Sequence, residues 1–343
     1  MLLGVPLVLG VGACATAPKS VAQPPAAASP RSPLESPAEA AEPTRERFTQ
    51  VSAGWGFACA IRSDKTLLCW GDDELGESSQ APAGQFDTVR AGFGYGCAIA
   101  STTHKLVCWG RDDEWKEGWL AGAAPQGQFD DVYVGEWRAC AIRTGSGHLV
   151  CWGRALGRDV VWDNHGWARD IPFANVWIDR DFVCGVRRDN GELACSPTDS
   201  PRVLPEGPFV QVYNHCALRE TGETICFPVA YKYDDEPVPQ ERFSRLATGS
   251  GFEPCGLVAQ TGRVVCWHGD ASGFKNLPDV AFTSLSTSWG LACGIRAEDG
   301  AVTCWGEQVD EGRVAAMPPY SSSSAQPPPS SPPPKEPADD VPR

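Results

Sequence analysis

The sequence lacks any cluster of basic residues. Its 29 Lys and Arg residues are also outnumbered by 43 Asp and Glu residues, which gives a net charge of -14. Affinity for nucleic acid comes from Lys and Arg residues that neutralise phosphates, so this composition argues against a nucleic-acid partner. The chain also lacks an apolar run of about 20 residues, the length that a membrane-spanning helix needs. The sequence therefore predicts neither a nucleic-acid-binding protein nor a protein with a membrane-spanning helix.

Signatures of catalysis are absent as well. The chain contains no Gly-x-Ser-x-Gly turn and no metal-binding His-Glu-x-x-His helix. Its histidines are scattered, at His104, His148, His165, His215 and His268. Acidic triplets at 72–74, 112–114 and 234–236 lack the spacing of a calcium loop, and we interpret them as solvated loop charge. We predict a protein that is not an enzyme and that uses no metal and no cofactor.

Two low-complexity segments flank the part of the chain that can bury a core. Residues 15–46 are mostly Ala, Pro, Ser and Glu, and residues 318–343 are mostly Pro and Ser. Such compositions bury too little apolar surface to offset chain entropy, so both segments are expected to be disordered tethers. Residues 47–317 are rich in Trp, Phe, Val and Gly and form the predicted folded domain.

The first 14 residues, MLLGVPLVLGVGAC, form a short apolar run that ends in small residues before a cysteine. This pattern resembles the signal of bacterial lipoproteins, although a basic n-region is missing. The resemblance implies that Cys14 becomes the lipidated first residue of an exported chain, with the outer membrane favoured over the inner one. A buried N-terminal strand is the alternative reading.

The remaining fourteen cysteines fall into seven consecutive pairs with no cysteine left over, as a secreted disulfide framework predicts. The pairs are Cys59 with Cys69, Cys97 with Cys108, Cys140 with Cys151, Cys184 with Cys195, Cys216 with Cys226, Cys255 with Cys266, and Cys293 with Cys304.

Most pairs enclose a turn signal such as SDK, TGSG or EDG, with apolar residues on both sides. This pattern is typical of a β-hairpin, in which the two cysteines lie opposite each other on neighbouring strands. Each pair is therefore predicted to staple one hairpin. Zinc thiolate sites are the rival interpretation, but they usually place cysteines two to four residues apart, and none of these pairs does so.

A second marker counts the same seven units. A Phe stands three residues before a Val or Leu ahead of each hairpin, at Phe48, Phe86, Phe129, Phe173, Phe209, Phe243 and Phe282. Successive markers are 34 to 44 residues apart. All-β units of about 40 residues that cannot bury a face alone are typical of propeller blades. The predicted fold is an all-β, seven-bladed β-propeller.

The order Ala-Gly, aromatic, Cys-Ala-Ile, turn, Val/Leu-x-Cys-Trp-Gly resembles the repeat of the regulator of chromosome condensation family, whose core reads AL-x-x-DG-x-V-x-x-WG. The resemblance covers about residues 47–317 and implies a seven-bladed propeller, closest to exported bacterial members with paired cysteines. Departures follow Cys195, Cys226 and Trp267, so blades four to six are expected to be the least regular. The founding member acts on a small GTPase and on chromatin, to which an acidic, exported chain has no access.

Eleven of the thirteen tryptophans fall into two groups. Seven occupy repeat positions, and we interpret them as packing between blades: Trp55, Trp70, Trp109, Trp152, Trp267, Trp289 and Trp305. Four lie outside the repeat register, in the two longest linkers: Trp115, Trp119, Trp162 and Trp167. Aromatic residues beside charges suit a recognition surface, so these four are the candidate binding face. The alternative is that they fold back over the ring.

Two hypotheses about function remain, and both assume a monomer. The first is a cell-envelope protein-binding module that is presented on a lipid-anchored stalk; an exported propeller that inhibits β-lactamases through one face shows that such a ring can also inhibit an enzyme. The second is a lectin-like propeller that stacks exposed Trp rings on cell-surface glycans. The residues identify neither a particular protein nor a particular glycan.

Overall fold

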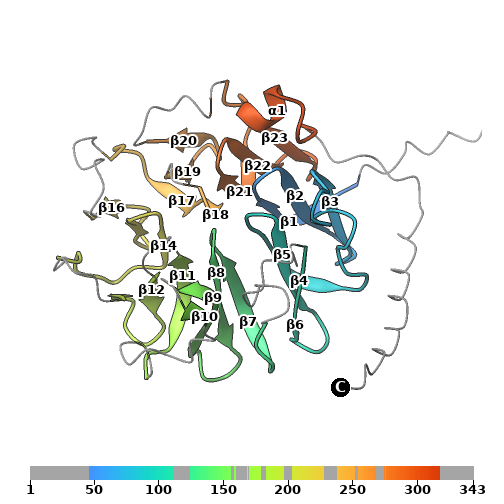
Figure 1. Cartoon of the computed structure of the whole chain (residues 1–343). Coiled ribbons are helices and arrows are strands. Elements are labelled where there is room, and N and C mark those ends of the chain that lie inside the picture. Colours follow the sequence, from blue (N-terminus) through green and yellow to red (C-terminus); the bar gives the residue numbers. More distant parts are fainter. Residues whose placement is uncertain are drawn as a thin grey trace, which may run out of the picture. The chain divides into compact units, whose positions relative to one another are not determined.

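The computed structural model describes residues 46–110, 124–155, 158–159, 168, 170–178, 183–196, 203–227, 238–251, 254–267, 274 and 276–316. All of them lie in the second of two compact units, Arg45–Arg343. Within these residues the chain forms seven small sheets around a common centre, which we name blades 1 to 7 in chain order (Figure 1). No helix in this part of the chain is both long enough and apolar enough to cross a membrane.

Each blade is built from consecutive strands, so the repeat in the sequence is also the repeat in the structure. Blades 1 to 3 consist of β1 (Phe48–Ala53), β2 (Phe57–Arg62) and β3 (Leu67–Gly71); of β4 (Phe86–Ala91), β5 (Tyr95–Ala100) and β6 (Leu106–Gly110); and of β7 (Phe129–Val134), β8 (Arg138–Arg143), β9 (Leu149–Ala155) and β10 (Arg158–Asp159). Blades 4 to 6 consist of β11 (Phe173–Ile178), β12 (Val183–Arg187) and β13 (Leu193–Cys195); of β14 (Gln211–Tyr213), β15 (Cys216–Leu218) and β16 (Thr224–Cys226); and of β17 (Phe243–Leu246), β19 (Cys255–Val258) and β20 (Val264–Cys266). Blade 7 consists of β21 (Phe282–Ser288), β22 (Leu291–Arg296) and β23 (Val302–Trp305), and β18 (Thr248–Gly249) joins β21 in parallel.

The predicted disulfides are confirmed. All seven cysteine pairs are bonded, and in every pair the two residues lie directly opposite each other in the register of the hairpin. Their Cα atoms are 3.9 to 4.1 Å apart. Seven disulfides indicate an oxidising compartment, because cytosolic thiols are kept reduced.

The same backbone hydrogen bond joins every pair of neighbouring blades. The N–H of each marker Phe donates to the carbonyl oxygen of a turn residue in the preceding blade, over 2.7 to 2.9 Å. The acceptors, in the order of the markers, are Gly300, Lys65, His104, Gly147, Gly191, Gly222 and Gly262, and all have a positive φ between 55° and 83°. Because Phe48 of blade 1 bonds to Gly300 of blade 7, the seam continues across the point where the ring closes.

The core lies between the blades rather than in one central cluster. The marker Phe and the Val or Leu three residues later are buried in all seven blades. The five tryptophans that follow second cysteines are also buried; Trp70 packs in one cluster with Leu291 and Val302 of blade 7, for example. Their predicted role in packing between blades is confirmed.

Blades 4 to 6 are less regular than the others, as their sequences predict. Each strand of blade 5 has only three residues, whereas the strands of blade 1 have five or six. A fourth strand that belongs to the blade's own repeat is present in blade 3, as β10. The shorter strands form fewer hydrogen bonds within each of these blades. The seam bond to the preceding blade is nevertheless present in blades 4, 5 and 6.

Candidate functional site

The four out-of-register tryptophans, Trp115, Trp119, Trp162 and Trp167, lie outside the described residues, and so does Cys14. Their predicted roles in binding and in lipid attachment therefore remain predictions. The described residues present a different aromatic surface, on the loops that connect the first and second strands of the blades.

Four aromatic side chains follow one another along these loops, in blades 7, 1, 2 and 3. We name them the aromatic arc: Trp289, Trp55, Phe93 and Trp137. The ring centroids of Trp55 and Phe93 are 5.3 Å apart in a stacked arrangement, and those of Phe93 and Trp137 are 6.0 Å apart. Trp289 is 39% exposed, and the other three are half-buried. The role of Trp55 in packing between blades is confirmed, whereas Trp289 is largely on the surface.

Glycines allow the loops of the arc to approach one another closely. The N–H of Trp55 donates to the carbonyl oxygen of Gly92 over 2.9 Å. A Cβ atom at Gly54 would lie 2.7 Å from that same oxygen, so any larger residue there would push the two loops apart. Gly56 has a φ of 79°, a conformation that glycine adopts without strain. The Gly-aromatic-Gly sequence of these turns thus places the rings of neighbouring blades in contact.

Residues 306–316, which we name the closing segment, hold blade 7 against blade 1 beside the arc. The segment contains the short helix α1 (Glu307–Asp310). The side chain of Gln308 accepts a hydrogen bond from Gly56 N over 2.8 Å and donates one to the carbonyl oxygen of Trp289. The guanidinium of Arg313 lies 5.8 Å from the centroid of the Trp55 ring. The closing segment therefore joins the first two members of the arc.

A cavity opens at the centre of the ring, and five of the seven blades line it. Including its open mouth, it encloses about 340 Å³. Its lining residues are Arg90, Tyr133, Val134, Asn175, Val176, Trp177, Ile178, Gln211, Val212, Tyr213, Ala247, Thr248 and Gly249. One of them, Val134, is the last residue of β7, which leads directly into the loop that carries Trp137. The cavity and the arc therefore share one end of the ring.

One ion pair lies in the wall of this cavity. Arg90 is 7% exposed, and its Nη2 atom lies 3.2 and 3.3 Å from the two carboxylate oxygens of Asp131. Among the described residues, Arg90 Nε has no hydrogen-bond partner. Burial raises the pKa of the neighbouring Tyr133 well above its ordinary value, and the charge of Asp131 raises it further. The Tyr133 phenol therefore remains protonated and can donate a hydrogen bond.

A repeat position supplies the large side chains of the cavity. The residue after the marker Val or Leu is Ser52, Ala247 or Ser286 in blades 1, 6 and 7. In blades 2 to 5 the same position holds large residues, namely Arg90, Tyr133, Trp177 and Tyr213. Sequence reasoning missed these four residues, although a comparison of this one column across the repeats would have found them. Their chemistry suits recognition, because Arg, Tyr and Trp are the residues that dominate binding hot spots.

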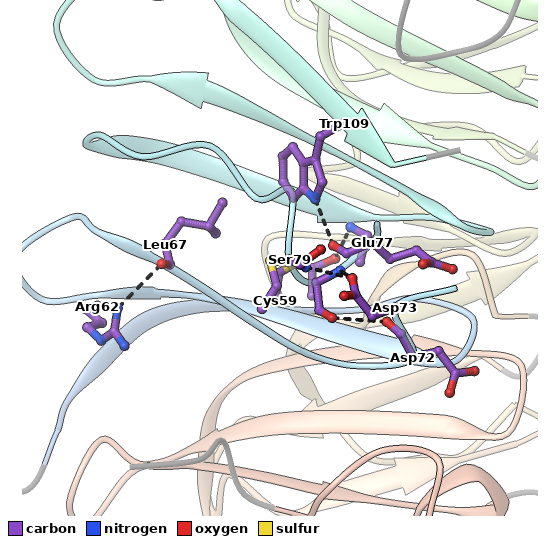
Figure 2. Close-up of a disulfide and its surroundings, with 12 residues drawn as sticks. Cys59, Arg62, Leu67, Asp72, Asp73, Glu77, Ser79 and Trp109 are labelled. Atoms are coloured by element: carbon purple, nitrogen blue, oxygen red, sulfur yellow. Dashed lines mark hydrogen bonds between the residues drawn. A yellow bond between two sulfur atoms is a disulfide. The ribbon is translucent and has the colours of Figure 1, made fainter. Parts of the chain in front are cut away.

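The linker after blade 1 has a structural role (Figure 2). The carboxylate of Asp73 accepts hydrogen bonds from the backbone N–H groups of Ser78 and Ser79, over 3.1 and 2.8 Å. The indole N–H of Trp109 in blade 2 donates to the carbonyl oxygen of Glu77 over 2.8 Å. Asp73 of the first acidic triplet thus orders this loop, and the carbonyl of Glu77 joins the loop to the next blade.

One group of potential metal ligands exists among the described side chains, at His215, Cys216 and Cys226. The two cysteines are bonded to each other in blade 5, so they offer no thiolate to a metal ion. Trp267 of blade 6 packs onto this disulfide, with its indole Nε1 3.5 Å from Cys226 Sγ. We interpret this group as part of the packing between blades 5 and 6.

Comparisons with known proteins agree with this architecture. The family model of the Regulator of chromosome condensation (RCC1) repeat matches residues 48–77, which contain blade 1 and the start of its linker. Among solved structures, the chain is similar to the CRINKLY WD40 ectodomain of the receptor kinase ACR4 from Arabidopsis thaliana, with 19% identity and a TM-score of 0.63 over 80% of this chain and 99% of that one. It is also similar to the entire ectodomain of the receptor kinase CR4 from Physcomitrella patens, with 21% identity and a TM-score of 0.61 over 76% of this chain and 74% of that one. No curated protein matches the sequence. The fold is thus an RCC1-like β-propeller.

Proposed function

We propose that this chain is an exported, non-enzymatic protein-binding module, and that the end of the ring with the aromatic arc and the central cavity is its docking surface. The observation that carries this proposal is the concentration of aromatic and Arg side chains at one end of a rigid ring. Buried Arg, Tyr and Trp anchors surrounded by half-exposed aromatic rings are typical of protein interfaces.

The setting that we propose is the bacterial cell envelope. The disulfides require an oxidising compartment, and Cys14 would tether the ring through a lipid at the end of the stalk 15–46. The two similar structures are ectodomains of receptor kinases, which supports an extracellular setting for this fold but no particular partner. A protein partner is favoured over a glycan because the cavity wall contains the buried guanidinium of Arg90, which suits an anchoring side chain of a protein.

The proposal is tested by chemical cross-linking of the full-length protein to cell-envelope proteins, followed by quantification of what each variant retains. Trp289→Ala and Trp137→Ala remove members of the arc that lie in loops, outside the strands of their blades. Leu277→Ala is the matched control, because Leu277 is 38% exposed and lies outside the arc. We expect both Trp variants, but not the control, to lose one discrete partner. Equal retention by all three variants would refute the proposed docking surface.

A second arm separates proteins from glycans. The same cross-linking is repeated in the presence of free saccharides and of solubilised cell-wall fragments. A protein partner is expected to remain bound, because free saccharide does not compete for the contacts between a protein and the arc. Complete competition by saccharide, together with loss of binding in Trp289→Ala, would replace the proposal with the lectin hypothesis.

A further inference from the structure

We propose that the aromatic arc binds the chain's own proline-rich C-terminal segment, residues 318–334, as a polyproline II helix. This inference rests on the proposed function in one respect, since it takes the arc to be a docking surface. It goes further by naming the chemistry of the occupant. A partner that uses the same surface would present a similar proline-rich segment and would displace the chain's own.

The chemistry of the two parts matches. Grooves lined by aromatic rings bind Pro-rich segments, because such segments are already extended and lose little entropy on binding. Residues 318–334 contain eight prolines, six of them in two triplets, 327–329 and 332–334. The arc offers rings from consecutive loops, and its most exposed member, Trp289, is 39% exposed.

A polyproline II helix has three residues per turn and rises about 3.1 Å per residue, so prolines three positions apart lie on the same edge of the helix, about 9 Å from each other. Pro329 and Pro332 are such a pair. Neighbouring ring centroids in the arc are 5.3 and 6.0 Å apart, so this pair spans more than two adjacent rings.

The path of the chain leaves the segment within reach of this surface, because residues 313–316 run from the arc along the outer strands of blades 7 and 1. Arg313 packs over the ring of Trp55, and Ala315 O accepts a hydrogen bond from the Trp70 indole over 3.2 Å. Ala316 O, at the end of the described residues, accepts a hydrogen bond from Cys304 N over 2.7 Å. The first triplet begins eleven residues after Ala316. An extended chain of eleven residues reaches about 36 Å. This reach is longer than the 5.3 and 6.0 Å between neighbouring ring centroids of the arc, so the first triplet can reach the arc from Ala316.

The segment 318–334 is favoured over the other proline-rich part of the sequence, residues 15–46. The closing segment, which leads into 318–334, is hydrogen-bonded to the loops of the arc through Gln308. Residues 15–46 contain no run of three prolines. A segment that is tethered within reach of its docking surface is present there at a high effective concentration, so even a weak contact is populated.

The test uses the full-length protein with a photoreactive benzoylphenylalanine in place of Ser330, between the two triplets. After irradiation at low protein concentration, mass spectrometry identifies the cross-linked peptides. We expect most cross-links to join residue 330 to the peptides that contain Trp55, Phe93 or Trp137 of the same molecule. Cross-links spread over the whole ring, or confined to peptides outside the arc, would overturn the inference.

Three further measurements strengthen the test. Replacing the six triplet prolines by Ser should reduce cross-linking to the arc at least about tenfold. Trp137→Ala should do the same, and Leu277→Ala should leave it unchanged. An equimolar mixture of light and ¹⁵N-labelled protein distinguishes contacts within one molecule from contacts between two. Mixed cross-links in the proportion expected for random pairing of light and labelled chains would overturn the assignment to the same chain.

Failure of this inference can be distinguished from failure of the proposed function. If residue 330 does not reach the arc but partner capture still depends on Trp289 and Trp137, only the C-terminal occupant is wrong. If neither measurement depends on the arc, the docking surface itself is wrong.

Discussion

Replacement of Gln308 by Ala tests how the ring closes. The Gln308 side chain is 4% exposed and joins the Gly56 N–H of blade 1 to the Trp289 carbonyl of blade 7. No other described side chain bonds to both of these loops. If this bridge holds the ring closed, its loss should lower the stability of the whole molecule and should also loosen the arc.

The magnitude follows from the two backbone groups that lose their partner. Gly56 is buried, so its N–H cannot turn to water, and a buried unsatisfied donor costs about 1 to 3 kcal/mol. Trp289 is exposed, so its carbonyl oxygen can be hydrated and adds little. We therefore expect Gln308→Ala to lower the free energy of unfolding by about 2 kcal/mol, which for a domain of this size lowers the Tm by roughly 3 to 4 °C.

The assay is thermal unfolding of oxidised protein, followed by circular dichroism at one scan rate. Gln85→Ala is the matched control, because the Gln85 amide makes an exposed hydrogen bond to Asp64 O over 3.1 Å. Gln308→Glu retains the acceptor for Gly56 but loses the donor for Trp289, and its Tm should lie between those of the wild type and Gln308→Ala. Equal Tm values for Gln308→Ala and Gln85→Ala would refute the reasoning.

Two other predictions concern the seam and the staples. Gly222→Ala should lower the free energy of unfolding in urea by more than about 1 kcal/mol, because φ is 83° and the new Cβ would lie 2.9 Å from Phe243 O. His104→Gly, at an equivalent position with φ of 55°, should leave it unchanged or raise it by up to about 1 kcal/mol; destabilisation would show that the His104 side chain matters more than its backbone. In unreduced, denatured protein, the cysteines of the seven disulfides should take up no iodoacetamide. After reduction, these cysteines should take up fourteen labels. Labelling of these cysteines without reduction would contradict the disulfides.

The fold could be predicted from the sequence because its specifying contacts are local. Each cysteine pair is 10 or 11 residues apart, within one hairpin, so the pairing follows from strand register alone. The marker Phe recurs with each blade, and its burial is a property of one blade and its neighbour. Local signals repeated seven times give a reliable count even where single repeats are irregular.

The arc could not be predicted in the same way. Trp55 and Phe93 occupy the same repeat position, but Trp137 lies one position later in its loop and still contacts Phe93. Repeat register alone would not place Trp137 in the arc. The Gln308 bridge is even less visible in the sequence, because Gln308 and Gly56 are 252 residues apart and outside the repeat pattern.

The separation between seam and cavity explains how a repetitive chain can carry a specific site. Every seam bond uses only backbone atoms, at the marker Phe and at the turn residue, so it places no demand on the side chain four positions after the Phe. That position is small in blades 1, 6 and 7 and large in blades 2 to 5, yet all seven seams are intact. The ring turns this column into one side of the central cavity, where Arg90 and Trp177 lie. Ser52 and Ser286 of the same column instead accept hydrogen bonds from the backbone N–H groups of Ala91 and Ala53 in the next blade. Substitutions of Arg90 and Trp177 are therefore expected to change the wall of the cavity and to leave the seam bonds intact, whereas substitutions of Ser52 and Ser286 would also remove hydrogen bonds between blades.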